Sequence, residues 1–110
     1  MSFSTELVGS TVEMLVLKLL SEREMYGYEI IQVVNERTNG DFNWKEGTLY
    51  PVLHRLEGGG YLATDWQMGE TGKRRKYYRL TAKGKNHAES KVVEWDKFSR
   101  SVNAVLFSAS

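Results

Sequence analysis

Cysteine is absent from the 110 residues, and histidine occurs only twice. Without cysteine the chain can form neither a disulfide framework nor a thiolate metal site, which is typical of proteins in a reducing compartment. We therefore expect it to work in the cytoplasm. His54 and His87 have no partner at metal-ligand spacing in their own segments. No metal and no other cofactor is expected.

A long hydrophobic run is missing as well. The apolar stretch at residues 14–20 is interrupted by Lys18, and it is far shorter than the roughly 20 residues that cross a bilayer. The first ten residues carry no basic segment of the kind that begins an export signal. We expect no membrane partner.

Groups arranged for catalysis are also lacking. No acid or base pairs with a nucleophile around Glu24, Glu29, Glu46 or Glu57. Because none of the usual catalytic roles is filled, we do not expect an enzyme.

Neither sign of charge is in excess. The net charge is +1, with 41% hydrophobic and 26% charged residues, a composition typical of one ordinary globular unit. Evidence for a polyanionic partner must therefore come from where the charges lie.

Hydrophobic spacing and turn residues predict three helices, a β-hairpin and a last helix. The third helix is expected to begin at a Thr48 cap, with Pro51 in its first turn and glycines 58–60 at its end. The other elements are expected over residues 6–20 and 26–37 (helices), 61–67 and 74–80 (strands), and from a Thr81 cap to the C-terminus (helix).

This order of elements is that of a winged helix-turn-helix, whose third helix enters the major groove of DNA. The fold class is therefore mainly α with a small β-hairpin. Residues 1–80 would form the DNA-binding domain, and residues 81–110 a long C-terminal dimerisation helix within the same folded unit.

The last helix carries an apolar stripe of about five turns, with no remaining chain to cover it. The first helix is also apolar over more of its circumference than one buried face needs. Pairing with a second copy would bury both surfaces and form a homodimer. The expected dimer interface consists of Leu7, Met14, Val92, Trp95, Phe98, Val102 and Leu106.

Five positive charges and no acid fall within residues 73–79, in a chain whose net charge is only +1. One interpretation is a solvated hairpin that uses charge to protect an edge strand. The other is contact with phosphates, which releases counterions and strengthens binding to nucleic acid. On the DNA interpretation, Lys73, Arg74 and Arg75 at the tip and outer face would meet the duplex.

The third helix keeps a face of small and polar residues once its buried positions are removed. Their hydroxyl, imidazole and guanidinium groups can bond phosphates or base edges, and Gly47 permits close approach of a phosphate to the backbone. The alternative for each of these residues is that it is simply exposed to solvent and binds nothing. The expected DNA contacts of this region are Lys45, Gly47, Thr48, Tyr50, Pro51, His54 and Arg55.

Trp95 lies near the middle of the last apolar stripe. It is either a core or interface aromatic or, beside its copy on a twofold axis, one wall of a flat apolar site for aromatic compounds.

Three blocks of the sequence carry a family resemblance. They are residues 26–30 (Tyr-Gly-Tyr-Glu-Ile), 47–57 (Gly-Thr-Leu-Tyr-Pro followed by Leu53 and Arg-Leu-Glu) and 75–81 (Arg-Lys-Tyr-Tyr-Arg-Leu-Thr). With these blocks at this spacing, nearly the whole chain resembles the PadR-type transcription regulators. The resemblance implies a dimeric winged-helix repressor that binds an inverted repeat in double-stranded DNA and leaves it when a small molecule binds.

The single C-terminal helix is similar to that of the small PadR subgroup, whose multidrug-sensing members stack planar aromatic compounds between two tryptophans. Trp95 matches that tryptophan's place. Two other functions stay open: a winged-helix module for protein interaction without specific DNA binding, and a dimer whose main role is ligand binding.

Overall fold

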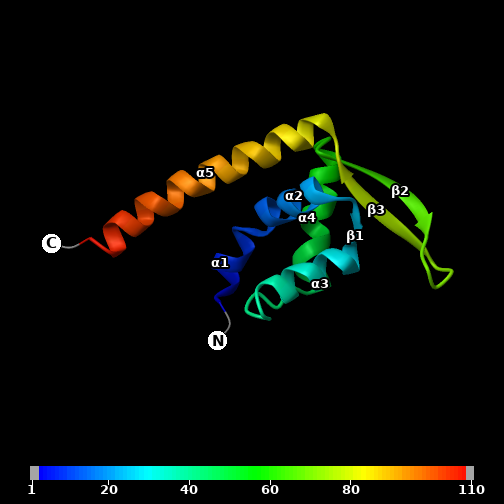
Figure 1. Cartoon of the computed structure of the whole chain (residues 1–110), viewed down its shortest axis with the longest axis horizontal. Helices are drawn as coiled ribbons and strands as arrows, with labels where there is room; N and C mark the ends of the chain where they lie inside the picture. The colour runs from blue at the N-terminus through cyan, green and yellow to red at the C-terminus, as the bar shows by residue number, and fades with distance from the viewer. Residues whose placement is uncertain (1–2, 109–110) are drawn as a thin grey trace.

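A computed structural model describes residues 3–108, so the outer limits of the predicted domains, residues 1 and 110, lie outside it. Figure 1 shows a compact body of helices, a β-hairpin wing at one end, and one long helix that extends away at the other. The elements are α1 (Thr5–Gly9), α2 (Val12–Glu22), β1 (Met25–Tyr26), α3 (Gly27–Arg37), α4 (Glu46–Gly58), β2 (Leu62–Met68), β3 (Arg74–Leu80) and α5 (Ala82–Leu106). The winged helix-turn-helix with a long C-terminal helix is confirmed.

The core lies where α2, α3 and α4 meet the inner face of the sheet. Each helix contributes a stripe of aliphatic residues at three- and four-residue spacing, such as Val16, Ile30 and Leu53, all of which are fully buried. From the strands, Leu62, Tyr78 and Leu80 are buried in the same core.

The predicted first helix, residues 6–20, is wrong as one element because the structure divides it into α1 and α2. Gly9 favours a helix end, and the hydroxyls of Ser10 and Thr11 donate hydrogen bonds to the carbonyls of Leu7 and Val8, which are among the last of α1. These carbonyls therefore need no further helical turn.

The sheet has three strands in the order β1-β3-β2, where the sequence predicted two. The extra strand β1 pairs antiparallel with β3, Met25 opposite Tyr78 and Tyr26 opposite Tyr77. The predicted start of the second helix at Tyr26 is therefore one residue early. This pairing joins the start of α3 to the wing.

Helix α4 begins at Glu46 with Lys45 as its N-cap, so the predicted Thr48 cap is wrong. Pro51 consequently lies in the helix interior and not in the first turn. Because proline has no N–H, residue 51 cannot donate the helical hydrogen bond to the Gly47 carbonyl. The predicted end is confirmed at Gly58, and Gly60 takes a φ of +81°.

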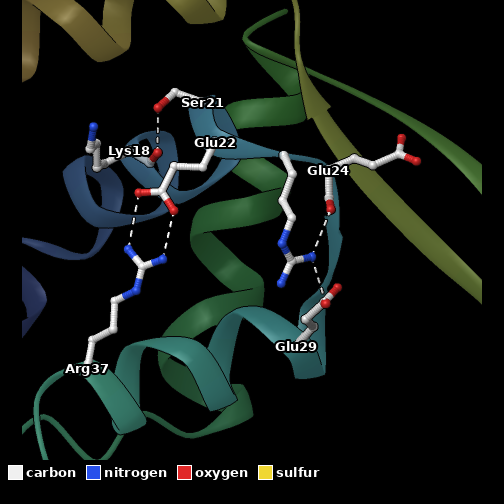
Figure 2. A network of polar contacts seen from close by, with 7 residues as sticks. Lys18, Ser21, Glu22, Glu24, Glu29 and Arg37 are labelled. Carbon is white, nitrogen blue, oxygen red and sulfur yellow. Dashed lines mark hydrogen bonds and ion pairs between the residues drawn. The ribbon is translucent and has the colours of Figure 1, made fainter.

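Ion pairs fasten α3 to the end of α2 (Figure 2). Both terminal nitrogens of Arg37 donate to the Glu22 carboxylate, at 2.7 and 3.1 Å. The hydrogen bond from Arg37 holds the pKa of Glu22 below its ordinary value. Arg23 pairs with Glu29 at 2.7 Å. These contacts fix the orientation of α3 beneath α2.

Helix α5 starts at the predicted Thr81 cap, whose side-chain oxygen accepts the N–H of Gly84. Gly84 and Ala88 are buried in its first turns, its first half lies along α2, and its C-terminal part projects beyond the body (Figure 1). Over residues 3–108, no helix is both long and apolar enough to cross a membrane.

Gly84 lies where α5 meets the end of the wing, and we expect Gly84→Ala to destabilise the fold. A Cβ at this position would overlap the backbone carbonyl of Tyr61. Alanine in a helix interior normally stabilises by about 1 kcal/mol relative to glycine, but here the clash should cost about 2 kcal/mol net. Thermal unfolding measures the change.

Gly58→Ala is the matched control for this substitution. Gly58 is also helical, and no other atom lies within 4 Å of the place that a Cβ would take. A stability of Gly84→Ala equal to that of Gly58→Ala would show that α5 does not dock on the Tyr61 carbonyl.

Candidate nucleic-acid interface

The exposed face of α4 is formed by Gly47, Pro51 and His54, which recur at helical spacing on the side away from the core. Open space lies beyond Gly47 because no atom lies within 4 Å of where its Cβ would be. Thr48 is half-buried and Lys45 is exposed just before the helix. The side chains of this face are small at the start of the helix and polar at His54, as the sequence indicated.

The loop before α4 is held by a side-chain clamp. Asn35 of α3 accepts the N–H of Trp44 at 2.7 Å and donates to its carbonyl at 3.1 Å. The indole of Trp44 is buried beneath the loop with 2% exposed. Asn39 and Asn43 take positive φ angles of 52° and 49°, which asparagine tolerates better than most residues. The start of α4 is thereby set against α3.

Tyr50 is less free than the rest of the predicted set. Its ring packs directly on Gly27, the first residue of α3, where any side chain would overlap the phenol. Burial raises the pKa of Tyr50 above its ordinary value, and the neighbouring Glu46 adds to the effect. Tyr50 thus joins the two helices of the helix-turn-helix and presents only part of its surface.

The five cations of the wing divide into two groups. Lys76 pairs with Glu57 of α4 at 3.3 Å, and Arg79 pairs with Asp65 of β2 at 3.1 Å. In the described part of the chain, the three remaining cations have no acid within ion-pair distance. These are Lys73, Arg74 and Arg75.

Aromatic rings orient two of these three cations. The guanidinium of Arg74 lies 5.6 Å from the ring centre of Trp66, and that of Arg75 lies 4.4 Å from the ring centre of Tyr26. Such contacts hold a cation while leaving its hydrogen-bond donors available. The outer wing therefore presents positive charge that acidic side chains do not neutralise.

A groove of 390 Å³ separates α4 from the wing. His54 and Tyr50 line it from α4, and Arg75 and Lys76 line it from β3. Sequence reasoning missed two exposed aromatics here, Tyr28 at 53% and Trp66 at 59% exposure. The remaining lining residues are Tyr26, Gly27 and Tyr78.

Trp95 lies between two hollows at the junction of α1, α2 and α5. The larger, 390 Å³, lies between α2 and α5, and the smaller, 180 Å³, is lined by apolar residues of α1 with Phe42. The Trp95 ring is 6.1 Å from that of Phe98. The larger hollow, called here the Trp95 pocket, is lined by Ser10, Glu13, Met14, Lys91, Glu94, Trp95 and Phe98.

The predicted dimer surface is largely uncovered in the single chain. Trp95 is 42% exposed and Phe98 59%. Met14 is half-buried. Leu17 is fully buried by its own chain, so part of the wide apolar circumference of the predicted first helix needs no partner. The other exposed members are Leu7, Val92, Val102 and Leu106.

Comparison with known proteins gives consistent matches. Residues 16–90 match the model of the transcriptional regulator PadR-like family. An uncharacterised protein of Lysinibacillus sphaericus is 37% identical over 91 residues, which cover 83% of this chain and 84% of that protein.

Two solved structures are similar over almost their whole length. A transcriptional regulator from Clostridium thermocellum is 35% identical, with a TM-score of 0.81 and coverage of 92% of this chain and 95% of that one. A PadR-like transcriptional regulator from Bacillus cereus is 28% identical, with a TM-score of 0.82 and coverage of 94% and 98%.

Proposed function

The chain belongs to the PadR-like family of transcriptional regulators, and we propose that it is a homodimeric repressor that binds an inverted repeat in double-stranded DNA and is released by a planar aromatic effector. On this proposal the protein works in the cytoplasm, with the chromosomal DNA. The observation that carries it is that His54 of the exposed α4 face and Arg75, one of the unneutralised wing cations, line the same groove.

This arrangement suits a duplex because the two elements can serve different parts of it. The exposed face of α4, with His54 as its polar side chain, would enter the major groove and meet base edges. Lys73, Arg74 and Arg75 of the wing would meet the adjacent phosphates. Lys45 and Thr48 flank the α4 face, and Arg55 lies at its edge, 63% exposed.

The uncovered half of the α5 stripe supports the dimer. Val102 and Leu106 belong to the last turns of α5, the part of the helix that projects from the body (Figure 1), and they are 39% and 66% exposed in the single chain. A second copy related by a twofold axis would cover this stripe with its own. It would also supply the second α4 that an inverted repeat needs.

The half-exposed ring of Trp95 supports the effector site. The larger hollow beside it already has an aromatic wall, formed with Phe98, and the twofold axis would add the partner's copy. Flat apolar walls of this kind suit a planar aromatic ligand.

The direct test is selection of duplexes from a random library by the wild-type protein, followed by nuclease footprinting. We expect an inverted repeat whose half-site centres are about one helical turn, roughly 34 Å, apart. Transcription in vitro from a promoter that overlaps the selected site should fall when protein is added. Failure to select any sequence would favour the protein-interaction module, and selection without reduced transcription would contradict repression.

The wing and α4 should contribute differently to affinity. Arg74→Ala should weaken binding to the selected operator and to random DNA by similar factors, and lower the slope of log affinity against log salt by about one unit. His54→Ala should weaken binding to the operator several-fold more than binding to random DNA, because base contacts carry sequence information. Fluorescence anisotropy at several salt concentrations measures both effects.

Arg100→Ala serves as the control for loss of a surface arginine. Arg100 lies on the projecting part of α5 and pairs with Asp96. Identical profiles for Arg74→Ala and His54→Ala on both DNAs would contradict the division between wing and helix.

A further inference from the structure

Glu13, in the first turn of α2, is shared between the Trp95 pocket and the recognition helix α4. One of its carboxylate oxygens lies 3.7 Å from the guanidinium of Arg55 on α4. The other lies 3.6 Å from His87 Nε2 and 3.7 Å from Lys91 Nζ, both on α5. The same Glu13 lines the wall of the Trp95 pocket.

None of these contacts is short enough to commit the carboxylate to a single partner. Hydrogen bonds between charged groups normally measure about 2.7–2.9 Å, whereas all three distances exceed this range. The Glu13 side chain is 26% exposed, so solvent screens it only partly. Its charge is therefore divided between α5 and α4, and a change on one side alters what is available to the other.

Lys91 determines how that charge is divided. Its ammonium lies 3.7 Å from Glu13 and 3.4 Å from Glu94, and all three residues line the Trp95 pocket. A hydrogen-bond acceptor on a planar aromatic effector, such as a phenol oxygen, would attract Lys91 away from Glu13 if the effector bound in the pocket. Glu13 would then keep two partners, His87, which is charged only when protonated, and Arg55, which is always charged and could compensate.

From these contacts we propose that Glu13 is a positioning residue that couples the Trp95 pocket to DNA binding. When Lys91 holds the carboxylate, Arg55 is free to extend from α4 towards a phosphate. When Lys91 is withdrawn, Glu13 retains Arg55 against α2 and removes it from the DNA. This inference rests on the proposed DNA-binding function, and it assigns the regulation of that function to one ion-pair cluster.

Substitutions can imitate both states without a ligand. Lys91→Gln removes the cation that competes with Arg55, so it should weaken binding to the selected operator about tenfold, within the usual range of coupling between sites. Glu13→Gln releases Arg55, so it should leave affinity equal to or higher than that of the wild type. The double variant Glu13→Gln, Lys91→Gln should bind like Glu13→Gln alone, because the effect of Lys91 acts through Glu13.

Two controls separate this pathway from a general effect of charge. Lys97→Gln makes the same charge change at an exposed position of α5 that has no ion pair among residues 3–108. It should change affinity less than twofold. In an Arg55→Gln background, Lys91→Gln should likewise have little effect, because Arg55 is the group through which Glu13 acts.

The measurement is fluorescence anisotropy with the selected operator at several salt concentrations, after thermal unfolding has verified that each variant folds. Lys91→Gln should also lower the salt slope by about one unit, the signature of one lost phosphate contact. Equal affinities for Lys91→Gln and Lys97→Gln would overturn the inference while leaving the proposed function intact. A lower affinity for the double variant than for Glu13→Gln alone would overturn it as well. A wild-type protein that selects no DNA would remove the proposed function and this inference together.

Discussion

Val102→Asp should convert the dimer into monomers and reduce affinity for the inverted repeat at least about a hundredfold, which corresponds to about 2.7 kcal/mol. Val102 lies on the projecting apolar stripe of α5 and is 39% exposed in the single chain. By twofold symmetry each dimer would bury two unpaired carboxylates, and an unpaired buried charge costs several kcal/mol. A monomer can occupy only one half-site, so the affinity for the full repeat falls with dimerisation.

Val93→Asp is the matched control because Val93 lies on the same helix, about half a turn away from the Val102 stripe. It is 70% exposed, and we expect its carboxylate to remain in solvent. Light scattering at micromolar concentration should return a dimer for Val93→Asp and for the wild type, and a monomer for Val102→Asp. If Val102→Asp stayed dimeric with unchanged DNA affinity, the α5 stripe would not be the interface.

Much of the fold could be predicted because its signals are local. The stripe of Ile30, Ile31 and Val34 identifies α3, and the structure buries all three residues. The Thr81 cap and the strand over residues 74–80 also depend on short-range chemistry that a single sequence displays. Each of these features is confirmed at its predicted position or within one residue of it.

The differences arise where distant contacts or hydroxyl chemistry decide the local structure. Strand β1 has only two residues, too few for any periodicity, and it exists because β3 lies beside it. Ser10 and Thr11 interrupt a hydrophobic pattern that continues across the break. Helix α4 begins before the predicted Thr48 cap, at a point next to the loop that Asn35 holds through Trp44, and Pro51 therefore falls in its interior.

The candidate site divides in the same way. A cluster of five cations is visible in the sequence, but that Lys76 and Arg79 are neutralised depends on Glu57 and Asp65, which other elements bring near. Trp66 gave no signal because an exposed aromatic in a strand has the same pattern as a buried one. Arg55 could be placed on an outer face, while its proximity to Glu13 required the packing of α4 against α2.

Trp95→Ala should abolish the response of the protein to planar aromatic compounds. In the proposed dimer, a ligand held between the two Trp95 rings would change the spacing of the two α4 helices, which must match about one helical turn of DNA. A ligand can release DNA only as far as it prefers the non-binding arrangement, and a preference of about 2.7 kcal/mol gives a hundredfold loss of affinity at saturation. Without the indole the ligand loses its stacking wall, and the DNA affinity should no longer depend on it.

The measurement compares wild type and Trp95→Ala in band shifts titrated with 2-naphthol, a planar phenol, and N-methylquinolinium, a planar cation. Binding can be followed independently by ¹⁹F NMR of protein labelled with 5-fluorotryptophan. This label is preferable to replacing Trp44, which is 2% exposed and whose loss would leave a cavity in the core. We expect the Trp95 signal to shift, the buried Trp44 signal to stay, and the Trp66 signal, on the wing, to change only with DNA. Release of DNA to the same extent from Trp95→Ala would show that the compounds act on the duplex or at another site, and absence of both the shift and the release would identify Trp95 as a packing residue of the dimer.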